Sequence, residues 1–90
     1  MITEKLQNAI NEQITAEMWS SNLYLAMSFY MEKEGYNGMA CWLKKQASEE
    51  KAHACEMASY IIKRGGKAKL DKIDVVPNDF GTPLEVFEQV

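Results

Sequence analysis

The sequence predicts an all-α fold, specifically a four-helix bundle of which this chain supplies a part. Two long stretches show the three- and four-residue spacing of apolar side chains that is typical of helices packed in a bundle. A short break separates them, so the second helix should fold back antiparallel to the first. A third helix-start signal, Thr82-Pro83-Leu84-Glu85, follows a long non-helical connection.

Composition indicates an ordinary globular chain. Ninety residues suffice for one small domain, and the 47% of hydrophobic and 26% of charged residues exclude a disordered protein. The net charge of −3, with no basic helix face, argues against a nucleic-acid partner. No apolar run approaches the roughly 18 residues of a membrane span, and the start of the chain has no signal-peptide core. We therefore expect a cytoplasmic protein without a membrane or nucleic-acid partner.

The first helix is expected over residues 3–34. Thr3 is a good N-cap residue, and Gly35 supplies the left-handed conformation that ends a helix. About 30 residues without Pro or Gly are far more than an average helix contains, which favours a bundle. The expected buried stripe of this helix consists of Leu6, Ile10, Gln13, Glu17, Tyr24, Met27 and Met31.

The second helix is expected over residues 37–64, because Gly65 and Gly66 end the pattern. Its two cysteines, Cys41 and Cys55, lie about 21 Å apart along the helix axis. A disulfide requires Cα atoms within about 7 Å, so we expect two free thiols, neither of them a metal ligand. The expected stripe consists of Met39, Leu43, Gln46, Glu50, His53, Met57 and Tyr60.

The connection over residues 65–82 is long enough to return along the whole bundle. Extended, it reaches up to about 55 Å, whereas the second helix is about 40 Å long. A third helix over residues 83–90 would then run parallel to the second, and Leu84 and Phe87 would begin its apolar stripe. After about two turns the chain stops at Val90, and isolated helices that short are marginal. We therefore expect residues 1–90 to be the N-terminal half of a larger bundle domain.

A hairpin of this kind should expose part of its apolar surface. We expect the faces that carry Leu6, Ile10, Leu43, Met57 and Ile61 to lie open on one side, and so to drive association with another polypeptide.

Three polar residues stand where apolar residues would be expected in the two stripes. Glu50 and His53 are three residues apart and share one helix face. Glu17 and His53 each lie about 18 residues from the turn, about 27 Å along the helix axis, so the three side chains should converge in the bundle interior. A carboxylate in a core is costly unless something pairs with it. The set predicts a metal site, and carboxylates with one imidazole suit iron or manganese better than structural zinc.

Two further residues leave alternatives open. Tyr24 lies two turns from Glu17 on the same face, where its phenol could hydrogen-bond a ligand carboxylate or simply be a core aromatic. Glu49 points about 100° away from Glu50 and could bind a further cation or be solvated. The Glu-x-x-His pattern on its own is also common as ordinary helix-surface charge.

These motifs together resemble the N-terminal half of a bacterial non-haem ferritin, over the whole chain. The similar residues are Asn11-Glu12-Gln13-Ile14-Thr15-Ala16-Glu17, Tyr24, Glu49-Glu50-Lys51-Ala52-His53 and the crossover that ends in Thr82-Pro83-Leu84-Glu85. The resemblance implies a ferritin-like four-helix bundle with one long crossover. It also implies a cage of 24 subunits that stores iron, and a ferroxidase that oxidises Fe(II) with dioxygen or hydrogen peroxide at a di-iron centre.

The resemblance also implies residue roles. Glu17 resembles a first-helix ligand of one iron, Glu50 the carboxylate that bridges both irons, and His53 the imidazole ligand. Tyr24 resembles the tyrosine beside the centre, and Glu49 a ligand of an additional iron site.

Two departures limit the resemblance. The remaining ligands of the family come from helices that this chain lacks, and Lys51 stands where haem-binding relatives carry methionine, so no haem is expected. The alternative function is a structural helical hairpin that completes a bundle by dimerisation, with an incomplete or inactive metal site.

Overall fold

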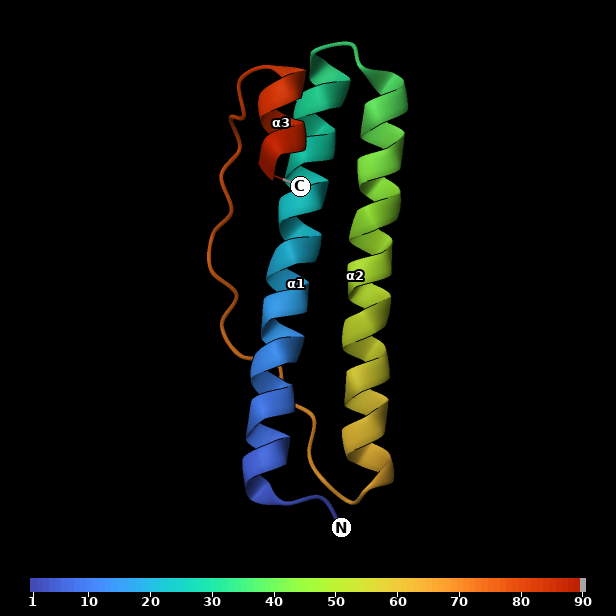
Figure 1. Cartoon of the computed structure of the whole chain (residues 1–90), viewed down its shortest axis with the longest axis vertical. Helices are drawn as coiled ribbons and strands as arrows, with labels where there is room; N and C mark the ends of the chain where they lie inside the picture. The colour runs from blue at the N-terminus through green and yellow to red at the C-terminus, as the bar shows by residue number, and fades with distance from the viewer. Residues whose placement is uncertain (90) are drawn as a thin grey trace.

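The computed structural model describes residues 1–89 and is an elongated helical hairpin with a crossover and a short third helix, 49 × 20 × 17 Å in extent (Figure 1). The helices are α1 (Glu4–Lys33), α2 (Asn37–Lys63) and α3 (Pro83–Gln89). Within residues 1–89 every regular element is a helix, and none of these helices is long and apolar enough to span a membrane. Of the expected third helix, Val90 lies outside the described residues, as do the side chains of Phe87 and Gln89.

The helix ends follow from capping chemistry. Thr3 has extended backbone angles, and its Oγ1 accepts a hydrogen bond from the Leu6 N–H at 3.2 Å. Gly35 and Gly65 follow α1 and α2 with φ of +89° and +78°, a region that side-chain-bearing residues rarely adopt. The two long helices therefore stop where the chain contains these glycines.

The contact between α1 and α2 is made largely by small and aliphatic side chains. Ile14 and Ser21 of α1 are buried, as are Ala47, Ala54 and Ile61 of α2. The Ser21 hydroxyl donates a hydrogen bond of 2.7 Å to the Ala47 carbonyl oxygen. Since the spacing of packed helices depends on the side chains between them, this face brings the two backbones close together.

The end of the hairpin near the α1–α2 turn holds a larger apolar cluster. Met27, Met31 and Leu43 are buried there against Phe80 and Val86. The crossover and α3 therefore close this end, which is the upper end in Figure 1.

An aromatic residue ties the end of the crossover to α1. Tyr30 packs edge-on against Phe80, with ring centroids 5.7 Å apart, and its hydroxyl donates a hydrogen bond of 2.8 Å to the Gly81 carbonyl oxygen.

The crossover runs back along α1 from the lower to the upper end of the hairpin, as expected, so that α3 runs parallel to α2 (Figure 1). Buried Asn11 holds its first part: the side-chain N–H donates to the Lys67 carbonyl at 3.0 Å, and Oδ1 accepts from the Lys69 N–H at 2.8 Å. No pattern in the sequence indicates this role of Asn11.

Two of the apolar residues expected on the open side are buried instead. Leu43 and Ile61 are 1% and 0% exposed, whereas Leu6 is 44% exposed. Gln13, His53 and Tyr60, also expected in the buried stripes of a complete bundle, are exposed in this chain. The reason is that helical periodicity identifies an apolar face but does not say which neighbour covers it, and small residues such as Ser21 do not stand out in an apolar pattern.

Candidate metal centre

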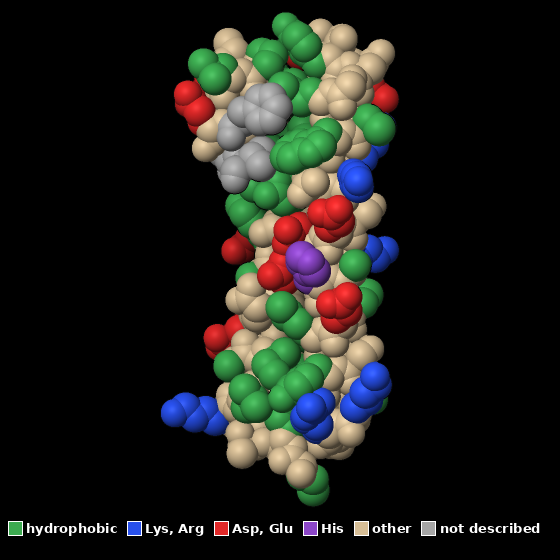
Figure 2. Space-filling model, turned by 45° about the vertical axis from the view of Figure 1, so that its right-hand side comes forward, with side chains coloured by type: hydrophobic (Ala, Val, Ile, Leu, Met, Phe, Trp, Pro, Cys, Tyr) green, Lys and Arg blue, Asp and Glu red, His purple; other side chains and the backbone are tan. Residues whose placement is uncertain are grey.

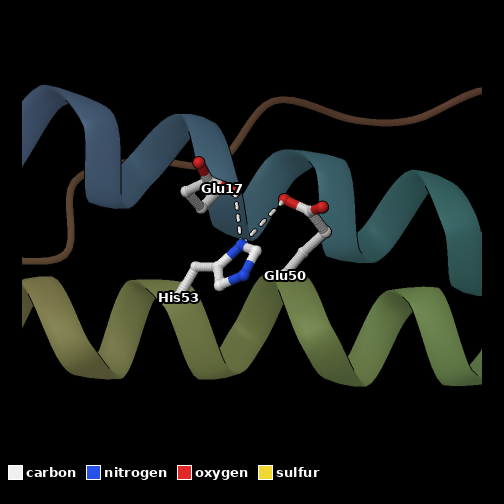
Figure 3. A group of neighbouring side chains, drawn as sticks. All are labelled: Glu17, Glu50 and His53. Atoms are coloured by element: carbon white, nitrogen blue, oxygen red, sulfur yellow. Dashed lines mark ion pairs between the residues drawn. The ribbon is translucent and has the colours of Figure 1, made fainter.

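Three side chains from two helices meet near the middle of the hairpin. Glu17 comes from α1, and Glu50 and His53 come from adjacent turns of α2 (Figure 3). One ligand atom from each lies within 4.8 Å of the other two. The expected convergence is thus present, and within the part of the chain that the structure describes it is the one group of three such residues.

The spacing of the donors suits a shared cation. His53 Nδ1 lies 4.0 Å from Glu17 Oε2 and 3.9 Å from Glu50 Oε2. Metal–oxygen and metal–nitrogen bonds are about 2 Å long, so two ligands of one ion lie up to about 4 Å apart. These separations are long for hydrogen bonds and lie at the upper limit for two ligands of one ion, so a small inward movement of the side chains would let them bind a common cation.

The two carboxyl groups shift each other's pKa in opposite directions. A hydrogen bond between them raises the pKa of Glu50 above its ordinary value, and removal from water and the negative charge of Glu17 raise it further. The same hydrogen bond lowers the pKa of Glu17. Two carboxylates held close together repel each other, and binding of one proton lowers that repulsion. A divalent cation can take the place of the proton.

The site lies on the surface of this chain and not in an enclosed interior. The Glu17 and Glu50 side chains are 15% and 22% exposed, but that of His53 is 52% exposed. Figure 2 shows the single histidine at the surface at mid-height, with acidic side chains beside it. The burial of His53 expected in a complete bundle is not reached within this chain, because two helices provide one wall of a bundle and leave the other side open.

Neighbouring residues differ in how closely they relate to the site. Gln13, expected only as a member of the first helix's stripe, donates a hydrogen bond of 3.0 Å to Glu17 Oε1 and so orients that carboxylate. A polar residue one turn before a candidate ligand was the available signal. Tyr24 is partly buried against the apolar cluster above the site. Glu49 is exposed and stands outside the three-residue group, although its charge contributes to the raised pKa of Glu50.

An apolar groove adjoins the site, toward the N-terminal end of α1 and the C-terminal end of α2. It is open to solvent and lined by Ala9, Ile10, Gln13, Glu56, Met57 and Tyr60. Both cysteines are free and exposed on α2, as expected, and neither belongs to the three-residue group.

Comparison with known proteins gives one consistent result. The model of the ferritin-like domain matches residues 7–90. The bacterial non-heme ferritin of Bacteroides fragilis strain 638R is 74% identical over 90 residues, covering 100% of this chain and 57% of that protein. The corresponding protein of Staphylococcus epidermidis is 38% identical over 88 residues, covering 98% of this chain and 53% of its own length.

Solved structures agree. An engineered closed form of the Archaeoglobus fulgidus ferritin superimposes with a TM-score of 0.97 at 39% identity, over 100% of this chain and 55% of that chain. The open-pore ferritin of the same archaeon superimposes with a TM-score of 0.95. The expected resemblance and the all-α bundle fold are confirmed, and the chain spans about half the length of these relatives. By its sequence and its fold, this chain belongs to the ferritin-like domain family.

Proposed function

We propose that residues 1–90 are the N-terminal half of a ferritin-like domain that stores iron, and that they supply half of a di-iron ferroxidase centre. The observation that carries the proposal is the convergence of Glu17, Glu50 and His53 from two helices onto one point. In the complete bundle, further helices would add the missing ligands and cover the open side. Relatives named as bacterial non-heme ferritins are about twice as long as this chain, which leaves room for two more helices.

The donor set fits iron as the substrate. Carboxylate oxygens and one imidazole bind Fe(II) and stabilise Fe(III), because hard oxygen ligands favour the higher charge. We assign to Glu50 the bridging role that the resemblance implies, since its carboxyl group lies in the same three-residue group as Glu17 and His53 and carries two oxygens, one for each ion. Gln13 holds Glu17 in position through its hydrogen bond to Oε1. Free, exposed Cys41 and Cys55 fit a reducing cytoplasm.

The chemistry proposed is a two-electron reaction. Each Fe(II) gives up one electron, so a pair reduces one hydrogen peroxide with two protons to two water molecules, or one dioxygen with two protons to hydrogen peroxide. A proton held on Glu50, whose pKa is raised, would leave as the ions bind. The product Fe(III) would then be deposited as a mineral inside a cage of 24 subunits. We assign Tyr24 to the residues beside the centre, Glu49 to an additional iron site, and no role to haem.

Metal binding tests the proposal on the ninety-residue chain. Co(II), which is stable in air and has a ligand-sensitive visible spectrum, is titrated into the chain and into Glu17→Gln. Because even outer partners of metal ligands cost about 10–100-fold in affinity when removed, loss of a ligand should cost at least about 100-fold.

The matched control is Glu12→Gln on the same helix. Glu12 is exposed and borders a different surface, between α1 and the crossover, so this variant should bind like the unaltered chain. Equal affinity of the unaltered chain and Glu17→Gln would refute the proposed centre and leave the structural hairpin as the function. In an assembly with all four helices, Fe(II) oxidation followed by stopped-flow absorbance should be lost in Glu50→Ala.

A further inference from the structure

The crossover is attached to α1 at two places that differ in kind. We infer that these two attachments open independently: the lower anchor, over residues 67–71, opens locally while the upper anchor, at Phe80 and Gly81, stays closed and keeps α3 in position. The two names follow their places in Figure 1. The inference concerns the crossover alone and does not depend on the proposed metal centre.

The lower anchor is a series of hydrogen bonds between α1 side chains and the crossover backbone. The α1 side chains lie four residues apart: Gln7, Asn11 and Thr15. Their oxygen atoms accept hydrogen bonds from every second backbone N–H of the crossover, at 3.1 Å from Lys67, 2.8 Å from Lys69 and 3.4 Å from Asp71. All three of these crossover residues are exposed. The helix therefore holds the crossover here by its backbone and not by its side chains.

The spacing explains why the hydrogen bonds repeat. Four residues of a helix rise about 6 Å, and two residues of an extended chain rise about 6.6 Å. The two repeats stay in step over the lower anchor, which has no surplus length. Its starting point is fixed as well, because the Gly65 and Gly66 N–H groups donate to the carbonyl oxygens of Ile62 and Ile61 and so end α2.

The upper anchor consists mainly of buried apolar side chains. Phe80 is 3% exposed and Val86 of α3 is 1% exposed, both within the same cluster. The hydrogen bond from the Tyr30 hydroxyl to the Gly81 carbonyl oxygen adds one polar contact. Segments with few buried apolar contacts open most readily, so the lower anchor should be the less stable of the two.

Between the anchors the crossover has length to spare. The nine residues from Asp71 to Phe80 can span about 30 Å, whereas the fifteen residues of α1 from Thr15 to Tyr30 rise only about 22 Å. Hydrogen bonds to α1 occur at Asp71 and again at Gly81, with none between them in the part of the chain that the structure describes. A segment with surplus length transmits no tension, so one anchor can open without pulling on the other.

Hydrogen–deuterium exchange of the purified protein tests the inference, with fragmentation that resolves single amides. In the unaltered protein, the amides of Lys67, Lys69 and Asp71 should exchange about tenfold more slowly than those of Ala68 and Leu70. The N–H groups of Ala68 and Leu70 donate to no group within the described residues.

One variant at each anchor tests their independence. Asn11→Ala removes the side chain that bonds to the crossover twice, and the Lys69 amide should then exchange about tenfold faster. The Val86 amide, which donates to the Thr82 carbonyl oxygen at 3.1 Å, should keep its exchange rate. Phe80→Ala should do the converse, with faster exchange at Val86 and an unchanged rate at Lys69.

A matched pair at one exposed position tests the lower anchor without altering α1. Lys69→Pro removes the N–H that donates to Asn11, and exchange of the Asp71 amide should rise about tenfold. Lys69→Ala keeps this N–H and should leave exchange at Asp71 unchanged. Leu70→Pro is the control for proline itself. Circular dichroism confirms that each variant is helical, and this pair provides the test should Asn11→Ala fail to fold.

Each part of the inference can fail separately. Uniform exchange over residues 67–71 would overturn the alternating hydrogen bonds of the lower anchor. Equal effects of Lys69→Pro and Lys69→Ala would overturn its attachment through the backbone. Acceleration of the Val86 amide by Asn11→Ala, to the same degree as the Lys69 amide, would overturn the independence of the two anchors.

Discussion

The two faces of the α1–α2 hairpin have opposite chemistry. Where the helices touch, the side chains are small or aliphatic and buried, as with Ile14, Ala54 and Ile61. On the adjoining open face lie two carboxylates, an imidazole and a groove with an exposed tyrosine. The first face holds this chain together, and the second has polar groups that nothing within the described residues encloses. In this molecule stability and chemistry therefore lie on different sides of the same two helices.

Core truncation provides the largest expected contrast between the faces. Leu43→Ala removes a side chain that is 1% exposed and should cost about 2–5 kcal/mol of unfolding free energy, through lost burial and the cavity left behind. Leu6→Ala, at a position 44% exposed, should cost within about 0.5 kcal/mol. Urea unfolding followed by circular dichroism measures both. Similar costs would mean that the two faces do not differ as described.

The helix ends and the height of the site could be predicted from the sequence, but the faces of the helices could be predicted only in part, for physical reasons. Capping chemistry is local, so Thr3, Gly35 and Gly65 predicted the helix ends closely. Equal distance from the turn brought Glu17 and His53 to the same height, because helix rise is constant.

The assignment of faces failed where it depended on the neighbour. Leu43 and Ile61 belong to the same broad apolar stripe as the open residues, and only tertiary packing decides which of them α1 covers. Asn11 and its hydrogen bonds to the crossover join residues 56 and 58 positions apart, and no local pattern indicates such a contact.

The hydrogen bond that orients Glu17 provides a test of the open face, and the expected effect is of intermediate size. Gln13→Ala removes the donor that holds Glu17 Oε1 and should lower the affinity for Co(II) by about tenfold, since residues that orient metal ligands have effects of that order. Unfolding free energy should hardly change, because Gln13 is exposed and outside the contact between the helices. Titration calorimetry with Co(II) measures the first quantity and urea unfolding the second. A large loss of stability with unchanged affinity would assign Gln13 to the wrong face.

The smallest expected effect is the pH dependence of the unfolding free energy of the metal-free chain. It reports on the two carboxyl groups of the open face. Glu50 has a pKa raised in the folded state, mainly by its hydrogen bond to Glu17, so the folded chain binds this proton more tightly than the unfolded chain does. That contribution to stability is present below the ordinary value of 4.5 and is lost as pH rises through the raised pKa. The lowered pKa of Glu17 acts in the opposite sense, and its contribution is lost as pH falls below 4.5.

The other carboxylates of the chain also titrate, so the informative quantity is a difference. Gln at position 50 cannot lose a proton, and the stability of the unaltered chain relative to Glu50→Gln should fall as pH rises from 4.5 toward neutrality. Glu12→Gln, at an exposed position that borders the surface between α1 and the crossover, is the matched control. Thermal unfolding in EDTA at several pH values measures both. Added Co(II) should reverse the trend, because the cation takes the place of the proton and binds better as pH rises. A relative stability that is flat with pH, with and without Co(II), would show that Glu17 does not raise the pKa of Glu50 and that the open face is not a metal site.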